Sequence, residues 1–158
     1  MTTVAAYYRS PIGPLEITCD ERGLAALRVL SAKKRVEPLR RFHSLLSKKC
    51  SMQLSQYFLG RRKSFNLPVS LNGTAFQKRV WSEIIKIPFG GTVSYKEIAR
   101  RAGKPQAIRA AASAVGDNPI PIIVPCHRVI RHDGSLGGYA LGIKKKGWLL
   151  RHEQTTRP

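Results

Sequence analysis

The organisation of this chain depends on one stretch, Asn118-Pro119-Ile120-Pro121-Ile122-Ile123-Val124-Pro125-Cys126-His127-Arg128-Val129-Ile130. Its apolar part, residues 120–124, is rich in β-branched residues and bounded by prolines, which predicts a short buried strand. Pro125 fixes its own φ and favours an extended residue before it, so Cys126 should follow a rigid approach. His127 comes next in the chain, and a nearby base can turn a thiol into the nucleophilic thiolate. The alternative is that Cys126 is a small buried apolar residue, as a lone cysteine most often is.

Charge is the strongest signal in the composition. The 158 residues include 28 Lys and Arg against 9 Asp and Glu, a formal net charge of +19. Such an excess suggests a polyanionic partner, most simply nucleic acid, with an anionic membrane surface as the competing interpretation. No apolar run approaches the roughly 20 residues that a membrane span needs, and no signal peptide is visible. We therefore expect no membrane partner and a location in the cytoplasm, with the nucleoid, or in the nucleus of a eukaryote.

The cysteines, Cys19, Cys50 and Cys126, are scattered along the chain without a close pair. This spacing argues against a disulfide framework and against a Cys-based zinc site, and it favours a reducing interior. We expect no metal and no cofactor, and we expect Cys19 and Cys50 to be structural or incidental.

Residues 1–73 predict a small N-terminal domain with an antiparallel sheet and one helix. Apolar-rich runs separated by turn-forming residues predict the strands of a meander. These runs cover residues 4–8, 15–19 and 24–30. Apolar residues at near-helical spacing predict a helix over 45–59, which Gly60 would end. A linker over 70–73 leads into a second domain, residues 74–158.

Two capping boxes predict helices in this second domain. In a capping box, a hydroxyl and a side chain three residues later both bind free backbone N–H groups. Thr74-Ala75-Phe76-Gln77 opens a helix to Ile85, and Ser94-Tyr95-Lys96-Glu97 opens one to Ala102. Together with the meander, these helices define an α+β fold whose C-terminal domain is mainly helical.

A helix-turn-helix follows from the next residues. Gly103 stops one helix, and Pro105 suits the first turn of an alanine-rich helix over 106–115. Ile108 falls where a helix-turn-helix needs a core residue. The alternative is an ordinary helical hairpin, and the positive net charge favours DNA binding.

The last part of the chain predicts a loop and a helix. Residues 133–139 form a glycine-rich loop, which either lets the backbone approach a ligand closely or is a plain surface connection. The final helix should cover 143–153, with Lys144, Lys145 and Lys146 exposed and 148–150 packed inward.

Separated motifs in this chain resemble the O6-alkylguanine-DNA alkyltransferases, and they occur in that family's order. Residues 125–129 match the Pro-Cys-His-Arg-Val core of the family at every position, and Asn118-Pro119 lies at the family's spacing. Residues 74–81 resemble its opening helix. The resemblance is close over 74–153 and loose over the first 73 residues. It implies DNA repair by irreversible transfer of an alkyl group from O6-alkylguanine, and possibly O4-alkylthymine, to Cys126, once per molecule and without a cofactor.

The same resemblance implies the roles of the catalytic residues. Cys126 is the alkyl acceptor, and His127 takes its proton through a water. Glu153 orients the imidazole and stabilises its cation, as in other nucleophile–His–acid relays. The side chain of Asn118 ties neighbouring backbone turns together.

DNA contacts and a guanine pocket are also implied. Arg109 enters the duplex and fills the space of the extruded base, with a plain phosphate contact as the alternative. Tyr95 helps to rotate the target nucleotide, and Tyr139 lines the guanine pocket and stabilises charge on the base. The remaining DNA-binding candidates are Ser94, Ala110 and Arg128, and the remaining pocket candidates are Val129, Gly137, Gly138 and Leu141.

Some residues depart from the family pattern. Ala112 and Leu141 stand where glycine is usual, and Asp117 stands where a neutral or basic residue is common. We expect Leu141 to narrow the pocket against bulky alkyl groups. The expected partner is double-stranded DNA containing O6-alkylguanine, without an obligate protein partner, and the protein should be a monomer. The competing functions are a non-catalytic helix-turn-helix DNA binder and a Cys-His hydrolase. A third is an alkyltransferase-like protein, which only binds damage, but such proteins lack the acceptor cysteine, so Cys126 argues against it.

Overall fold

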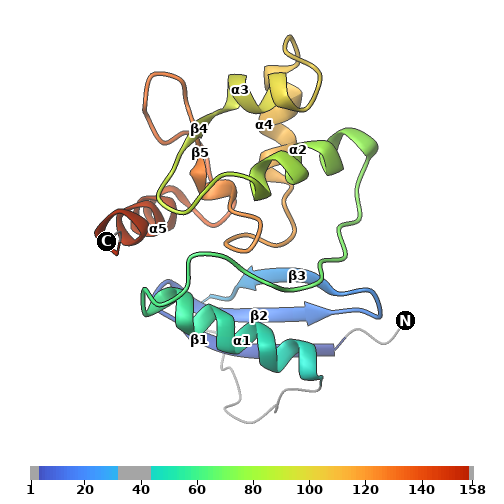
Figure 1. Cartoon of the computed structure of the whole chain (residues 1–158), viewed down its shortest axis with the longest axis vertical. Coiled ribbons are helices and arrows are strands. Elements are labelled where there is room, and N and C mark those ends of the chain that lie inside the picture. Colours follow the sequence, from blue (N-terminus) through green and yellow to red (C-terminus); the bar gives the residue numbers. More distant parts are fainter. Residues whose placement is uncertain (1–3, 32–43, 157–158) are drawn as a thin grey trace. The chain divides into compact units, whose positions relative to one another are not determined.

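The computed structural model describes residues 4–31 and 44–156, and its contacts divide the chain into two compact units. Unit 1 is Met1–Leu71 and unit 2 is Asn72–Pro158, close to the boundary that the linker suggested after residue 73. Unit 1 combines a sheet with a helix, whereas unit 2 is mainly helical (Figure 1). The predicted α+β class is confirmed.

Unit 1 contains the predicted antiparallel meander. Its strands β1 Val4–Ser10, β2 Gly13–Cys19 and β3 Leu24–Val29 pair in the order β1-β2-β3. Alternate side chains of β2 point to one face, where Leu15, Ile17 and Cys19 are buried. This period of two is what a half-buried strand requires.

One helix, α1 Leu45–Phe58, packs against β1 and β2. It begins with a capping box that the sequence analysis did not identify, in which Ser44 and Ser47 bind each other's backbone N–H groups. Cys50 and Leu54 lie on its buried face, whereas Leu45 and Met52 are exposed. Successive residues of a helix are rotated by about 100°, so Leu45, nine residues before Leu54, points to the opposite face of the helix. Since Leu54 faces the sheet, Leu45 faces solvent.

Unit 2 consists of helices around a very short parallel strand pair. In chain order its elements are α2 Ala75–Ile85, β4 Val93–Ser94, α3 Tyr95–Arg101, α4 Ile108–Gly116, the short 3₁₀ turn η1 Cys126–Arg128, β5 Val129–Ile130 and α5 Ile143–Thr155. Val93 of β4 pairs with Val129 of β5. This pairing holds the start of α3 beside the segment that carries Cys126.

The two predicted capping boxes of unit 2 differ. At α2 the box is complete, because Thr74 and Gln77 bind each other's backbone N–H groups. At α3 only half of it forms: the Ser94 hydroxyl accepts from the Glu97 N–H. The Glu97 carboxylate instead accepts from Arg100 and Arg101 within the helix. Two nearby guanidinium groups are stronger donors to a carboxylate than a neutral backbone amide.

Helices α3 and α4 are consecutive and packed together, with Gly103 at φ 83° in the connection. The sequence placed the start of α4 too early, because residues 105 and 106 form a turn in which the Ala107 N–H donates to the Lys104 carbonyl. Ile108 was expected in the core, but 38% of it is exposed. It is the first residue of α4 and faces a cavity described below.

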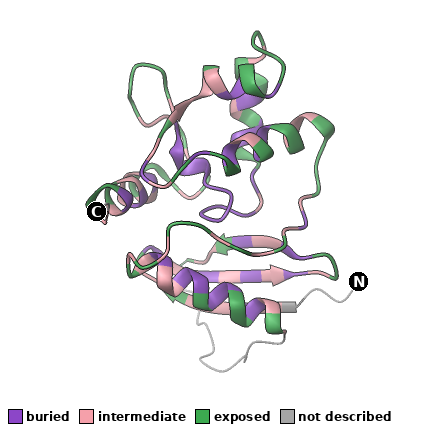
Figure 2. Cartoon of the chain, in the orientation of Figure 1, coloured by how far each residue is buried: buried purple, intermediate pink, exposed green. Residues whose placement is uncertain are grey.

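Residues 120–124 are buried as predicted, but they form a tight turn rather than a strand. The Val124 N–H donates to the Ile120 carbonyl, and Ile122 has a φ of 75°, which is rare for a β-branched residue. The Asn118 side chain accepts from the Ile120 N–H and donates to the Val124 carbonyl. These bonds replace the strand partners that a buried backbone would otherwise need. Figure 2 colours buried residues purple, and this segment is one of the buried parts of unit 2.

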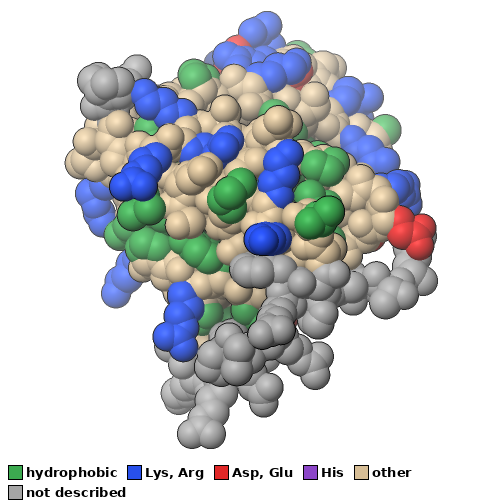
Figure 3. Space-filling view, turned by 60° about the horizontal axis from the view of Figure 1, so that its bottom comes forward, with side chains coloured by type: hydrophobic (Ala, Val, Ile, Leu, Met, Phe, Trp, Pro, Cys, Tyr) green, Lys and Arg blue, Asp and Glu red, His purple; other side chains and the backbone are tan. Residues whose placement is uncertain are grey.

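The surface reflects the net charge of +19. On the face shown in Figure 3, Lys and Arg side chains are spread among hydrophobic ones, and acidic side chains are few. Among the helices of the described residues, none is long and apolar enough to cross a membrane.

Trp81→Phe should destabilise unit 2. The Trp81 side chain is 1% exposed, and its indole N–H donates to the Ala114 carbonyl at 2.8 Å, which joins α2 to α4. Loss of a buried hydrogen bond costs about 1–3 kcal/mol of unfolding free energy. Urea unfolding would measure this loss. Trp148→Phe, at a half-buried position of α5, is the control, and an equal loss in both variants would contradict this role of Trp81.

Candidate active site

Cys126 lies at the end of the buried turn, as the first residue of η1. Its N–H donates to the Val124 carbonyl at 2.8 Å, and only 2% of the residue is exposed. Burial raises the pKa of the Cys126 thiol, because a charged sulfur would lose its hydration. The Asn118 side chain, the Lys146 charge and the Tyr139 hydroxyl act in the opposite direction and favour the thiolate. The structure therefore brings three groups that stabilise a thiolate to a thiol that is otherwise held neutral.

A buried carboxylate, Glu153 of α5, lies at the centre of the site. Its Oε1 is 2.7 Å from His127 Nε2, and its Oε2 accepts from the Gly90 N–H at 3.1 Å. Glu153 and His127 are both 0% exposed. Helix α5 also holds Gly90 from its other side, since the Gln154 amide donates to the Gly90 carbonyl. The His127 imidazole is thus fixed by a helix that begins 16 residues after it in the sequence.

Arg128 completes this cluster, which corrects its predicted role. Its Nε and Nη2 donate to Glu153, and its Nη1 donates to the Ile87 carbonyl at 2.6 Å. The residue is only 5% exposed. A guanidinium turned inward in this way cannot reach a phosphate, so the prediction that Arg128 binds DNA is wrong. Arg128 instead neutralises Glu153.

The protonation states follow from these contacts. Burial would raise the pKa of Glu153, but hydrogen bonds from His127 and Arg128 outweigh it and hold that pKa well below its usual range. Burial lowers the pKa of His127, which keeps the imidazole neutral despite the pull of Glu153. An ionised carboxylate can only accept, so Nε2 carries the single ring proton. Nδ1 is left as an acceptor, and it has no hydrogen-bond partner among the residues that the structure describes.

Lys146 is the residue that the sequence analysis missed. It was expected to be exposed, yet it is 0% exposed. Its Nζ donates to the Val129 carbonyl at 2.7 Å, the Gly138 carbonyl at 3.1 Å and the Tyr95 hydroxyl at 3.2 Å. Burial lowers the pKa of Lys146 to about 8, while the nearby Cys126 raises it. The sequence signal was its spacing: Lys146 precedes the buried Leu149 and Glu153 by three and seven residues, which places it on the inner face of α5.

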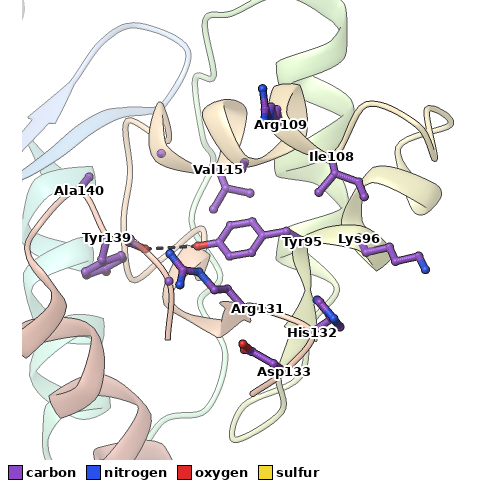
Figure 4. A pocket seen from close by; sticks show the side chains of 14 residues that line it. Tyr95, Lys96, Ile108, Arg109, Val115, Arg131, His132, Asp133, Tyr139 and Ala140 are labelled. Carbon is purple, nitrogen blue, oxygen red and sulfur yellow. Dashed lines mark hydrogen bonds between the residues drawn. The ribbon is translucent and has the colours of Figure 1, made fainter. Parts of the chain in front are cut away.

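A cavity of about 780 Å³ opens between α3, α4 and the loop that follows β5 (Figure 4). Five of the predicted site residues line it: Tyr95, Arg109, Gly137, Gly138 and Tyr139. Four others do not line the cavity: Ser94, Ala110, Val129 and Leu141. Leu141 is half-buried outside the cavity, so nothing in the structure supports the expectation that it narrows the pocket. Ala112 does line the cavity, so the residue that replaces the family's usual glycine adds its methyl group here.

The cavity wall combines aromatic, apolar and basic side chains. Tyr95 and Tyr139 supply the aromatic side chains, and Ile108 and Val115 of α4 provide apolar surface (Figure 4). Arg109 is exposed and follows Ile108 at the start of α4. Within the described residues, no group of three or more His, Cys, Asp or Glu side chains could hold a metal.

A helix pair beside a basic cavity, next to a cysteine with a buried His–Glu pair, defines a DNA-binding protein with a nucleophilic thiol. Two family models match the chain: the 6-O-methylguanine DNA methyltransferase DNA binding domain over residues 75–155, and the ribonuclease-like domain of the same family over residues 3–71. The chain therefore belongs to the 6-O-methylguanine DNA methyltransferase family.

Individual relatives agree with this assignment. The chain is 46% identical over 147 residues to a methylated-DNA–protein-cysteine methyltransferase of Methanosarcina barkeri, covering 92% of this chain and 93% of the relative. It is similar to the crystal structure of Mycobacterium tuberculosis O6-methylguanine methyltransferase, with a TM-score of 0.86 and 41% identity over 99% of this chain and 96% of that one. A structure of the M. tuberculosis protein in complex with DNA matches with a TM-score of 0.85 and 42% identity, covering 98% of this chain and 94% of that one.

Glu153→Gln should destabilise the protein by about 3–5 kcal/mol, because Arg128 and its charge would remain buried without a carboxylate. It should also change the pH dependence. The pKa of folded Glu153 is lowered, so its contribution is present above the ordinary value of 4.5 and is lost as the pH falls below it. The pKa of His127 in the folded protein is lowered from 6.5, so a separate loss of unfolding free energy begins as the pH falls below 6.5.

Urea unfolding at a series of pH values would measure both effects. Glu153→Gln should remove the loss below pH 4.5 and keep the one that begins at 6.5. The matched control is Glu83→Gln, which breaks the surface pair with Lys86 and should cost less than about 1 kcal/mol. Equal costs in the two variants would show that the Glu153 cluster contributes little to stability.

Proposed function

We propose that this protein repairs DNA by transferring the alkyl group of O6-alkylguanine to Cys126, once per molecule. The observation that carries the proposal is the buried Glu153–His127 pair, 2.7 Å apart, whose histidine directly follows Cys126 in the chain. Membership of the 6-O-methylguanine DNA methyltransferase family supports the same reaction.

The first step in this mechanism is removal of the thiol proton. Neutral His127 presents Nδ1 as an acceptor, and a water can bridge it to the thiol of Cys126. The ionised Glu153 stabilises the imidazolium that forms. The thiolate then attacks the alkyl carbon, the bond from that carbon to O6 breaks, and its electron pair passes to the guanine.

The negative charge that leaves with guanine needs donors in the cavity. Tyr139 lines it, and Lys146 places a buried cation at the Tyr95 hydroxyl. Donors that are already fixed before the reaction stabilise developing charge without reorganisation. The product is a thioether at Cys126, which has no leaving group for a return step, so each molecule acts once.

A base inside a duplex cannot reach a buried thiol, so the target nucleotide must be flipped out. We propose that Arg109, which is exposed near the start of α4 and lines the cavity, fills the vacated stack. We propose double-stranded DNA as the partner, an active monomer without an obligate protein partner, and action wherever the cell keeps its DNA. A non-catalytic DNA binder is the alternative, and alkyl transfer to the protein distinguishes the two.

Incubation with a duplex that contains O6-methylguanine should add one methyl group to the protein, at Cys126. Intact-mass and peptide analysis would measure it, and the reaction should stop when each molecule has reacted. Cys19→Ala should leave the reaction unchanged, and Cys126→Ser should abolish it. Burial raises the pKa of Cys50 to about 12, so its thiol should not react. Repeated turnover, or methylation at Cys19 or Cys50, would contradict the proposal.

Arg109→Ala should slow repair of duplex DNA by about ten- to a hundredfold, because flipping a base costs a few kcal/mol that the side chain offsets. Reaction with the free base O6-methylguanine should change little, since no duplex has to open. Single-turnover rates on both substrates would measure the effect. The alternative is that Arg109 only contacts phosphate. In that case Arg109→Ala should weaken the salt dependence of binding equally for damaged and undamaged DNA.

A further inference from the structure

The cavity contains an arginine that the proposed mechanism does not use. Arg131 follows β5 directly, lines the cavity and is exposed. Its backbone is held in a turn, because its N–H donates to the Ser135 carbonyl and its carbonyl accepts from the Gly134 N–H. Its guanidinium forms no hydrogen bond or ion pair with the residues described, 4–31 and 44–156. The side chain is thus placed by a fixed backbone and is free to bind a ligand.

Arg131 lies close to two side chains of the site, Lys146 and Tyr95. Its positive charge lowers the pKa of Lys146 and opposes the burial that raises the pKa of Tyr95, so both side chains are within its field. Figure 4 shows the Arg131 guanidinium turned toward the Tyr95 hydroxyl, with Tyr139 beyond it. The Tyr95 hydroxyl is itself 3.2 Å from Lys146 Nζ.

One acid in the cavity wall, Asp133, interacts electrostatically with Arg131, which contributes to lowering the pKa of Asp133. The Asp133 carboxylate accepts from the Ser135 N–H at 2.9 Å and from its hydroxyl at 2.7 Å, and no ion pair joins it to Arg131 in the described structure. The wall around it is basic, with Lys96 and Arg109. A concave site with cations of this kind and low-dielectric walls favours anionic ligands. Arginine in particular binds carboxylates through two parallel hydrogen bonds.

We propose that Arg131 makes this protein accept O6-alkylguanines whose alkyl group carries a carboxylate, with O6-carboxymethylguanine as the simplest example. This inference rests on the proposed alkyl transfer to Cys126. The sulfur bonds to the methylene carbon, the bond from that carbon to O6 breaks, and its electron pair goes to guanine. The thiol proton passes to His127 and later to the base. The carboxylate takes no part in the bond changes and remains paired with Arg131 in the S-carboxymethylcysteine product.

The phosphate of the extruded nucleotide is a second source of the same anion chemistry. The two sources differ in their substrate dependence: a phosphate contact helps every alkyl group in DNA equally, and it is absent with a free base. A carboxylate contact helps only the charged alkyl group, in DNA and in the free base alike.

The test compares three lesions in one oligonucleotide duplex: O6-methylguanine, O6-carboxymethylguanine and its neutral isostere O6-carbamoylmethylguanine. Each is also supplied as the free base. The wild-type protein should prefer the carboxymethyl over the carbamoylmethyl lesion by about five- to tenfold, as expected for an ion pair in a partly screened site. Arg131→Gln should remove this preference and keep the rate on O6-methylguanine. Added salt should weaken the wild-type preference.

Arg151→Gln is the matched control, because it removes the same charge from an exposed position of α5 that does not line the cavity. It should retain the wild-type preference. An equal carboxymethyl-to-carbamoylmethyl ratio in wild type and Arg131→Gln would overturn the inference. The inference would also be overturned if Arg131→Gln slowed repair of all three lesions in DNA equally and left the rates on the free bases unchanged. That result would show that Arg131 binds phosphate. Failure of the wild type on O6-methylguanine would instead overturn the proposed function itself.

Discussion

The rest of unit 2 depends on one buried carboxylate, that of Glu153. Its oxygens accept hydrogen bonds from His127, Arg128 and the Gly90 N–H, which lie 25 to 63 residues away in the sequence. Burying a charge costs several kcal/mol unless such donors are in place. Glu153 can therefore be buried only when η1, α5 and the loop after α2 have all assembled. The contacts that orient His127 for catalysis are the same contacts that close the fold.

A second constraint holds the nucleophile. Ile122 is fully buried at φ 75°, a conformation that costs of order 1–3 kcal/mol for such a residue. The surrounding contacts maintain it: Asn118 binds the backbone on both sides of the turn, and the side chains of residues 120–124 are all buried. Strain of this kind persists at sites where the structure must fix one residue accurately. Here that residue is Cys126, which follows the turn by two positions.

The sequence predicted the elements whose signals are local. The meander, α1, α2 and the helical pair follow from turns, caps and apolar spacing, and they form as expected except that α4 starts at Ile108 instead of residue 106. The errors lie where distant residues decide. The turn at residues 120–124 is an exception, because a β-branched run suits a buried strand or a buried turn equally well. There the Asn118 side chain selects the turn through bonds within the same segment. Lys146 and Arg128 are charged, so composition places them outside, but their partners lie far away in the chain and draw them inward.

The charges of buried Lys146 and Cys126 influence each other. An ammonium without a carboxylate partner is costly inside a protein, and the pKa of Lys146, lowered to about 8, reflects that cost. A thiolate in the same place would be costly for the same reason. The two penalties offset each other when the thiol ionises, because each charge becomes the other's counter-ion. The cation is then already in position when negative charge moves from sulfur toward the base. The fold thus holds, before the reaction, a buried cation whose charge favours ionisation of the Cys126 thiol.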